Sequence, residues 1–183
     1  MKKFLFLAAT ILLTINLFAE KVPATDNRIT FVGRSFVENG SYRFDWPSTY
    51  FRMAFTGKTL SMRVTDTKRN FYAVWFDAPT SAEPTHIIEV KGNDTIIDLI
   101  TLEDTKKSKI KQHQVVIQRR TEANCGTTTV HEFITDGRFL QAEPLRSRQI
   151  EFIGDSYTCG YGVDAPSRRD PFKDETENAS RTY

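Results

Sequence analysis

The chain has 183 residues, with 25 Lys and Arg side chains against 23 Asp and Glu. Residues 1–19 contain two basic side chains and no acidic one, so the remainder carries 23 of each sign. This balance argues against a nucleic-acid-binding protein, which needs a concentrated basic surface. A content of 39% hydrophobic and 12% aromatic residues is enough to build a core. The 2 cysteines are too few for a disulfide scaffold and lack zinc-finger spacing.

The amino terminus is typical of an export signal. Lys2 and Lys3 precede an apolar run over residues 4–15, and Ala19 offers a small residue at which a signal peptidase can cut. The run is well short of the ~20 residues that span a bilayer, which argues against a membrane anchor. We therefore expect residues 1–19 to be a signal peptide. The mature protein is then exported to the periplasm, the cell surface or the medium, without membrane attachment.

Residues 28–136 contain one short strand pattern after another. β-branched and aromatic residues dominate, and turn signals recur about every ten residues, which is typical of an antiparallel β-sandwich. Residues 51–55 and 60–65 alternate between apolar and polar side chains, and the Gly57-Lys58 turn between them predicts a hairpin. The predicted strands are 29–32, 41–46, 51–55, 60–65, 71–76, 87–90, 96–102, 115–117 and 130–134. The side chains predicted to face the core from the hairpin are Phe51, Met53, Phe55, Leu60, Met62 and Val64.

A different organisation begins near residue 149. The polar residues 141–148 include a proline and predict a linker after a sandwich domain at 20–140. Residues 150–153 are apolar and predict a short strand. Such a strand has no neighbours in this chain to cover its two faces, so we expect residues 164–183 to be poorly ordered.

The predicted strand runs directly into Gly154, Asp155 and Ser156. An exposed serine just after a strand can act as a nucleophile, and its own backbone N–H can donate to an oxyanion. The nucleophile elbow of α/β-hydrolases does not fit, because Thr158 stands where its second glycine is required. Asp155 neighbours the serine on an extended chain, where adjacent side chains point apart, so we expect it to orient the loop rather than to serve as the triad acid.

Two phosphate-binding motifs match the sequence poorly. A dinucleotide fingerprint can be aligned with Gly160, Gly162 and Ala165, but Pro166 and a charged stretch follow where an apolar helix is required. A phosphate loop at residues 57–59 lacks its earlier glycine and falls in a predicted turn between strands.

The sequence IEFIGDSYTCGYGV at residues 150–163 resembles the first conserved block of the SGNH (GDSL-type) hydrolases. With this block, the stretches at 44–47, 51–57 and 119–122 make the chain similar to carbohydrate esterase family 2 over residues ~28–183. Members of that family place a jelly-roll sandwich before the hydrolase domain. The resemblance therefore implies a mainly β chain: an antiparallel jelly-roll β-sandwich, then the first strand and nucleophile loop of an α/β/α SGNH domain. Residues 149–183 are too few for a complete domain of that kind, so we expect an N-terminal fragment of a longer protein.

The resemblance also implies an enzyme that removes acetyl groups from sugars or plant polysaccharides, with no metal or organic cofactor. The family's nucleophile and its first oxyanion N–H donor both correspond to Ser156. The family's catalytic histidine and its other two oxyanion donors have no counterpart in the chain. The residues expected to support the nucleophile loop are Gly154, Asp155, Thr158, Gly160 and Gly162.

The histidines are His86, His113 and His131, and all three lie in the predicted sandwich. A general base must lie within hydrogen-bonding distance of the serine, so we expect none of the three to serve Ser156. His131 and Glu132 are adjacent on a predicted strand and should point to opposite faces, which argues against a metal-binding pair.

Two further sets of side chains leave alternatives open. Cys125 and Cys159 could form a disulfide in an exported protein, or they could remain free thiols. Four aromatic side chains could stack on sugar rings, although aromatic residues on strands more often belong to the core. These are Trp46, Tyr50, Tyr72 and Trp75.

Two functions of different classes follow from these observations. The first is a secreted carbohydrate esterase that acts on an acetylated carbohydrate through Ser156 and a histidine outside this chain. The second is a non-catalytic carbohydrate-binding sandwich that carries a broken esterase remnant at residues 149–183. A serine hydroxyl needs an adjacent base to react, so we expect residues 20–183 alone to be inactive.

Overall fold

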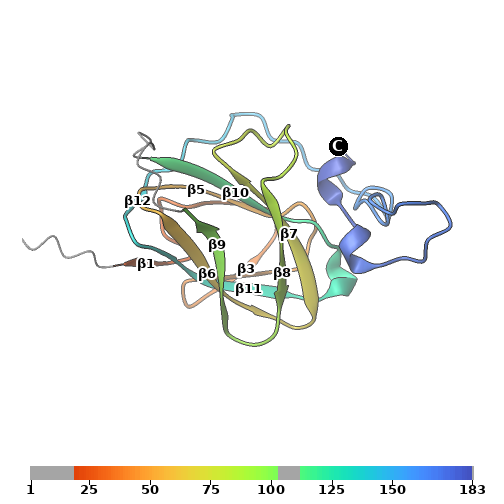
Figure 1. The fold of residues 1–183 in the computed structure, drawn as a ribbon, viewed down its shortest axis with the longest axis horizontal. Coiled ribbons are helices and arrows are strands. Elements are labelled where there is room, and N and C mark those ends of the chain that lie inside the picture. The colour runs from red at the N-terminus through yellow and green to blue at the C-terminus, as the bar shows by residue number, and fades with distance from the viewer. Residues whose placement is uncertain (1–18, 103–111, 183) are drawn as a thin grey trace, which may run out of the picture.

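The computed structural model describes residues 19–102 and 112–182. They form two six-stranded sheets that pack face to face as a sandwich, with short 3-10 helices at one end (Figure 1). Every strand pair is antiparallel, which confirms the mainly β, antiparallel sandwich expected from the sequence. Apart from Ala19, the predicted signal peptide lies outside the described residues. Within the described part of the chain, no helix is long and apolar enough to cross a membrane.

The two sheets use strands from all parts of the sandwich sequence. The first sheet has the order β3 (Phe36–Glu38), β4 (Ser41–Phe44), β11 (Thr128–Thr135), β6 (Thr59–Asp66) and β9 (Thr95–Thr101), and β1 (Glu20–Pro23) also pairs with β11. The second has the order β12 (Phe139–Leu140), β5 (Tyr50–Phe55), β10 (His113–Arg119), β7 (Arg69–Phe76) and β8 (His86–Lys91), and β2 (Thr30–Val32) also pairs with β5. The short 3-10 helices are η1 (Ala123–Cys125), η2 (Asp174–Thr176) and η3 (Ala179–Arg181). Every strand predicted within the sandwich overlaps an observed strand, whereas β1, β3 and β12 are missed by the sequence pattern.

The hairpin predicted for residues 51–65 is wrong, because β5 and β6 belong to different sheets. β5 pairs with β10, and β6 pairs with β11 and β9. The turn between them crosses from one sheet to the other and passes so close to Gly137 that a Cβ at Gly57 would lie 2.6 Å from its backbone nitrogen. The six side chains predicted to be inward are all buried, because β5 and β6 face each other across the core.

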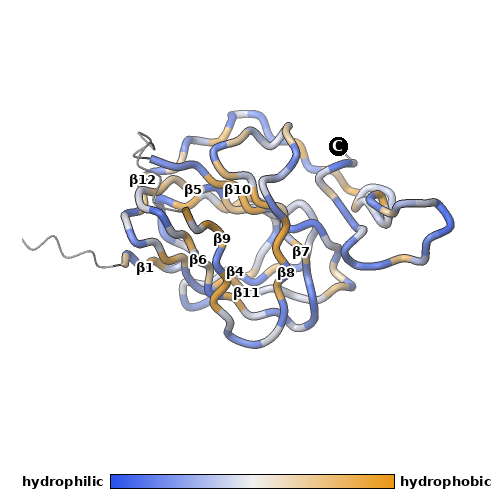
Figure 2. The backbone as a smooth tube through the Cα atoms, in the orientation of Figure 1, coloured by the Kyte–Doolittle hydropathy of each residue, from blue (hydrophilic) through white to orange (hydrophobic). Residues whose placement is uncertain are grey.

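The core between the sheets is rich in aromatic rings. Phe51 on β5 makes edge contacts with Phe31 on β2 and Phe133 on β11, with centroids 5.0 and 5.2 Å apart. Figure 2 shows the hydrophobic segments concentrated on the strands, with hydrophilic segments in the connections. Burial of this apolar surface is the main contribution that stabilises the sandwich.

The strand β7 is covered on both faces, as its continuous apolar sequence predicts. Val74 points into the core, while Trp75 points out of the sheet and is nevertheless 2% exposed. The connection between β7 and β8 covers Trp75, and its indole N–H donates to the Ala82 carbonyl at 2.8 Å. Trp75 therefore stabilises the outer face of the second sheet.

The aromatic core gives a direct test of the packing. We expect Phe51→Ala to lower the free energy of unfolding by about 3 to 5 kcal/mol, the usual cost of removing a buried phenylalanine. The exposed Ile96→Ala on β9 is the matched control and should change it by less than about 0.5 kcal/mol. Urea unfolding followed by tryptophan fluorescence measures both values. Equal losses in the two variants would contradict the observed core.

Candidate active site

Ser156 follows an extended segment that crosses the end of the sandwich. Residues 150–153 form no strand, contrary to the sequence prediction, and Ile150 and Ile153 are 79% and 80% exposed. A strand requires a partner for its backbone groups, and no described residue pairs with this segment in a sheet. Arg34 of the sandwich and Glu151 of this segment form an exposed ion pair of 2.8 Å.

A compact turn, residues 154–163, carries the serine, and we call it the nucleophile turn. Its first backbone hydrogen bonds are made by the Asp155 carbonyl, which accepts from the N–H groups of Thr158 and Cys159 at 3.0 and 3.2 Å. The Asp155 carboxylate accepts from the Tyr157 N–H at 3.0 Å, so it caps the turn in the manner expected of a loop-orienting residue. Ser156 is exposed at the beginning of this turn, where a substrate can reach its hydroxyl.

Glycines let the nucleophile turn close on its neighbours. A Cβ at Gly154 would lie 2.0 Å from the Thr158 hydroxyl, so Gly154 and Thr158 can pack together only without it. Gly160 has φ +75° and lies so close to the Asn178 carbonyl that a Cβ would be 2.3 Å from it. Gly162 also has a positive φ, of +66°, but has open space around it. Gly160 thus allows a second backbone segment to approach the turn.

That second backbone is the C-terminal segment, residues 174–182, which contains η2 and η3. Residues 176–179 are buried, and the Asn178 N–H donates to the Gly160 carbonyl at 3.1 Å. The Asp164 N–H donates to the Thr176 carbonyl at 2.9 Å, and the Thr182 hydroxyl donates to the Thr158 carbonyl at 2.6 Å. The expectation that residues 164–183 are poorly ordered is therefore wrong for this segment. It packs against the sandwich and needs no complete parallel sheet to do so.

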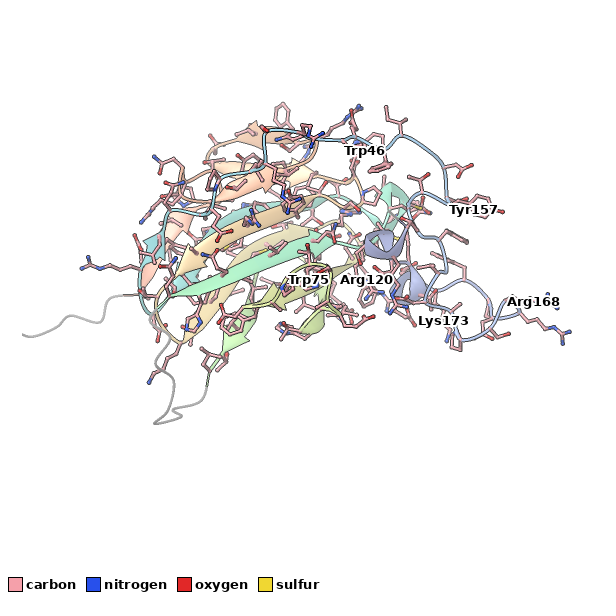
Figure 3. The ribbon with its side chains drawn as sticks, turned by 90° about the horizontal axis from the view of Figure 1, so that it is seen from above. Trp46, Trp75, Arg120, Tyr157, Arg168 and Lys173 are labelled. Atoms are coloured by element: carbon pink, nitrogen blue, oxygen red, sulfur yellow. The ribbon has the colours of Figure 1, made fainter. Side chains whose placement is uncertain are left out.

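Two adjacent arginines at the end of β10 connect the sandwich to the nucleophile turn. Arg119 points into the sandwich and donates to the carbonyls of Glu122 and Gly126 at 2.9 and 2.7 Å. Arg120 points the other way and is 2% exposed, with its Nε donating to the Glu177 carbonyl at 3.2 Å. Figure 3 shows Arg120 beneath the short C-terminal helices, whereas Tyr157 and Arg168 project away from the sandwich. Burial lowers the pKa of Arg120. The neighbouring Asp164 carboxylate acts in the opposite direction.

Two thiols and two carboxyl groups meet where the C-terminal segment covers η1, and we call them the thiol–carboxyl cluster: Glu122, Cys125, Cys159 and Glu177. The Cys125 thiol lies 3.8 Å from a Glu177 oxygen, and the Cys159 thiol lies 3.7 Å from a Glu122 oxygen. The Glu122 N–H donates to Glu177 at 2.8 Å. Both cysteines are free thiols in the structure and do not form the disulfide that the sequence left open as an alternative.

Burial governs the protonation of this cluster. It raises the pKa of each thiol to about 12, and burial together with the neighbouring Glu122 raises the pKa of Glu177 to about 7. Atoms of Glu122, Cys159 and Glu177 lie within 4.8 Å of one another, close enough to share a metal ion. A thiol must lose its proton to bind a metal ion, and the raised thiol pKa makes that loss costly.

The histidines lie on strands of the sandwich, as predicted: His86 on β8, His113 on β10 and His131 on β11. The His113 Nδ1 lies 2.8 Å from the Asp77 carboxylate, and the His131 Nε2 lies 2.9 Å from the Thr65 hydroxyl. These partners belong to the sandwich, so the contacts assign both rings to structural roles there.

The prediction that His131 and Glu132 face opposite sides of β11 is wrong. The register of β11 shifts between Val130 and Glu132, which marks a β-bulge. His131 contacts Thr65 and Glu132 pairs with Arg63, and both partners lie on the outer face of β6. The bulge adds one residue to β11 and thereby places two successive side chains on the same face.

The four aromatic candidates separate by exposure. Trp75 and Tyr72 are buried and Tyr50 is half-buried, whereas Trp46 is 51% exposed. Trp46 lines a cleft of about 400 Å³ together with Phe152, close to the segment that leads to Ser156. The guanidinium of Arg34 lies 5.3 Å from the centre of its ring. Among the four, Trp46 alone offers a large exposed ring surface.

The comparison with known families agrees with this arrangement. The model of the carbohydrate esterase 2 N-terminal domain matches residues 31–144. The chain belongs to this family. An acetylxylan esterase / glucomannan deacetylase of Cellvibrio japonicus is 35% identical over 143 residues, which cover 74% of this chain and 36% of that protein. The cellulase/esterase CelE of Acetivibrio thermocellus is 28% identical over 168 residues, covering 89% of this chain and 19% of that protein.

Solved structures of family 2 carbohydrate esterases share the fold. The structure of a family 2 esterase from Clostridium thermocellum in complex with cellohexaose matches with a TM-score of 0.74 and 26% identity, over 84% of this chain and 45% of that one. The structure of a family 2 esterase from Cellvibrio japonicus matches with a TM-score of 0.78 and 23% identity, over 90% of this chain and 47% of that one. The chain thus spans less than half the length of these relatives.

The structure adds site residues to which the sequence alone assigned no function. Arg120 and Glu122 lie in a stretch that carries the family resemblance, and Asp164 and Glu177 lie in the stretch expected to be poorly ordered. The available signal was the run of charged residues directly after the apolar strand β10. Burial of such a run requires partners from another part of the chain.

The raised pKa of Glu177 gives a pH-dependent test. In the unfolded chain the Glu177 pKa is 4.5 and in the folded chain about 7, so the folded chain holds the extra proton between these values. The contribution of Glu177 to stability is therefore full below pH 4.5 and is lost as the pH rises through 7. We expect Glu177→Gln, which cannot ionise, to gain thermal stability relative to the native chain as the pH rises from about 5 to 8. Melting followed by circular dichroism measures the difference.

The exposed Glu175→Gln, on the same 3-10 helix as Thr176, is the control for this experiment. Its melting temperature should follow that of the native chain across the pH range. A constant difference between Glu177→Gln and the native chain would show that Glu177 does not titrate in this interval.

Proposed function

We propose that the full-length protein is an exported carbohydrate esterase that removes O-acetyl groups from sugars or plant polysaccharides, with Ser156 as its nucleophile. The observation that carries this proposal is the nucleophile turn, which presents Ser156 at the surface of a sandwich that belongs to carbohydrate esterase family 2. Relatives named acetylxylan esterase favour an acetylated substrate, and a relative whose structure is in complex with cellohexaose favours a carbohydrate chain. The basic and apolar residues of 1–19 favour export.

In the proposed reaction, the Ser156 oxygen attacks the acetyl carbonyl carbon while a histidine base takes the hydroxyl proton. The backbone N–H of Ser156 donates to the oxygen that becomes negative. Collapse of the intermediate transfers the proton to the sugar oxygen, which leaves as a hydroxyl group. Water then attacks the acetyl-enzyme and releases acetate, and the serine regains its proton. We assign this base to a histidine outside the chain, because His113 and His131 are engaged within the sandwich and His86 lies on β8 of the same sandwich.

The second candidate function is a non-catalytic carbohydrate-binding sandwich. The observation that favours it is Trp46, whose exposed ring lines a cleft and could stack on a sugar. This function requires binding that depends on Trp46 but no ester hydrolysis that depends on Ser156. Replacement of Ser156 therefore distinguishes the two functions, because only the esterase depends on this residue.

Replacement of the nucleophile tests the esterase directly. In the full-length protein, we expect Ser156→Ala to lower kcat for acetylated xylan and 4-nitrophenyl acetate by roughly 10⁴-fold or more, because loss of a serine nucleophile typically costs several powers of ten. The isolated residues 20–183 should release no more acetate than their Ser156→Ala variant, because they lack the base. Acetate release measured by a coupled assay gives both results.

The control is Ser167→Ala, a change of the same kind at an exposed serine of the charged stretch. It should retain the native rate. If the full-length protein is equally active with alanine at position 156, the esterase proposal is wrong. If polysaccharide binding is then lost in Trp46→Ala, the carbohydrate-binding function takes its place.

A further inference from the structure

Arg120 belongs to the sandwich, but its guanidinium binds the part of the chain that surrounds the nucleophile turn. Its Nη2 donates to the Asp164 carboxylate at 2.5 Å, and its Nε donates to the Glu177 carbonyl at 3.2 Å. Its own backbone carbonyl accepts from the Ala179 N–H at 3.2 Å. The side chain is 2% exposed, so these contacts are shielded from water.

The groups held by Arg120 are connected to the turn by short steps. Asp164 follows the turn directly, and its carboxylate also accepts from the Asn178 side-chain amide at 2.8 Å. The Asn178 backbone N–H donates to the Gly160 carbonyl at 3.1 Å. Gly160 lies in the turn that begins at Asp155 and carries Ser156. One side chain of the sandwich therefore fixes both backbones that border the nucleophile turn.

Within the proposed esterase function, on which this inference rests, we infer that Arg120 is a positioning residue for the nucleophile. It does not contact Ser156, and it acts through Asp164, Asn178 and Gly160. The sandwich is then a structural part of the active site and not an independent module joined by a linker.

The expected consequence lies in the catalytic step. The serine oxygen and the Ser156 N–H must both be in place when the carbonyl is attacked, and a displacement of about 1 Å can cost about 100-fold in rate. Substrate affinity depends on other surfaces and should change little. Loss of Arg120 should therefore lower kcat while KM stays near its native value.

The experiment measures kcat and KM of the full-length protein with acetylated xylan. We expect Arg120→Ala to lower kcat by roughly 10- to 100-fold with KM within about twofold of native. Arg120→Lys keeps the positive charge beside Asp164 and should restore part of the rate. Asp164→Asn removes the partner carboxylate while keeping the side-chain shape, and should lower kcat in the same direction.

The matched control is Arg69→Ala. Arg69 on β7 also contacts the C-terminal segment, through Glu175 at 3.0 Å, but this ion pair is exposed to solvent. Exposed pairs contribute little, so kcat should stay within about twofold of native. Circular dichroism melting of every variant shows whether it is folded. If Arg120→Ala does not fold, the kcat values of Arg120→Lys and Asp164→Asn test the inference.

A fluorophosphonate that reacts with activated serines separates the two proposals. No labelling of the native protein at Ser156 would overturn the proposed function itself. If the native protein is labelled at Ser156 and kcat is unchanged in folded Arg120→Ala or in Asp164→Asn, the inference about Arg120 is wrong. The proposed esterase function is then unaffected. A fall in kcat with slower Ser156 labelling and an unchanged KM supports it, as does recovery in Arg120→Lys.

Discussion

Two adjacent arginines at the end of β10 determine how the two parts of this chain fit together. Successive side chains of an extended strand point to opposite sides, so Arg119 enters the sandwich while Arg120 enters the segment that surrounds Ser156. Arg119 closes the loop that carries η1 by binding its carbonyls, and this loop supplies Glu122 and Cys125 to the contact with the C-terminal segment. The position of the nucleophile turn therefore depends on the end of one strand.

Buried charges are costly unless they are fully paired, which explains the density of polar contacts in this region. Arg119 donates to the Thr128 hydroxyl at 3.2 Å, and this hydroxyl in turn donates to the buried Asp66 carboxylate. Arg120 forms a direct ion pair with the Asp164 carboxylate. The thiol–carboxyl cluster next to them has the opposite character, because burial raises the pKa of its two thiols and of Glu177 and so favours their uncharged forms. The junction thus combines two arginines with a carboxyl group, Glu177, whose pKa of about 7 makes its charge depend on pH.

The sequence predicted what depends on local pattern and missed what depends on contacts between distant segments. Alternation in β5 and β6 identified Phe51 and Met62 as core residues, but alternation is the same for a hairpin as for two strands in opposite sheets. The bulge at His131 has no signature of its own in the sequence. The turn at Gly154 and Ser156 was found through its motif, whereas Arg120 could not be assigned because its partners lie 44 and 57 positions away.

Hydrogen exchange of the backbone amides tests most directly whether Arg120 holds the C-terminal segment on the sandwich. The N–H groups of Asp164, Asn178 and Ala179 each donate to a carbonyl at this junction. In residues 20–183 we predict that these three amides exchange much more slowly than in an unstructured peptide, and that Arg120→Ala removes their protection while β5 and β10 stay protected. Exchange at the unstructured rate in the native chain, or protection that persists in Arg120→Ala, would contradict this account.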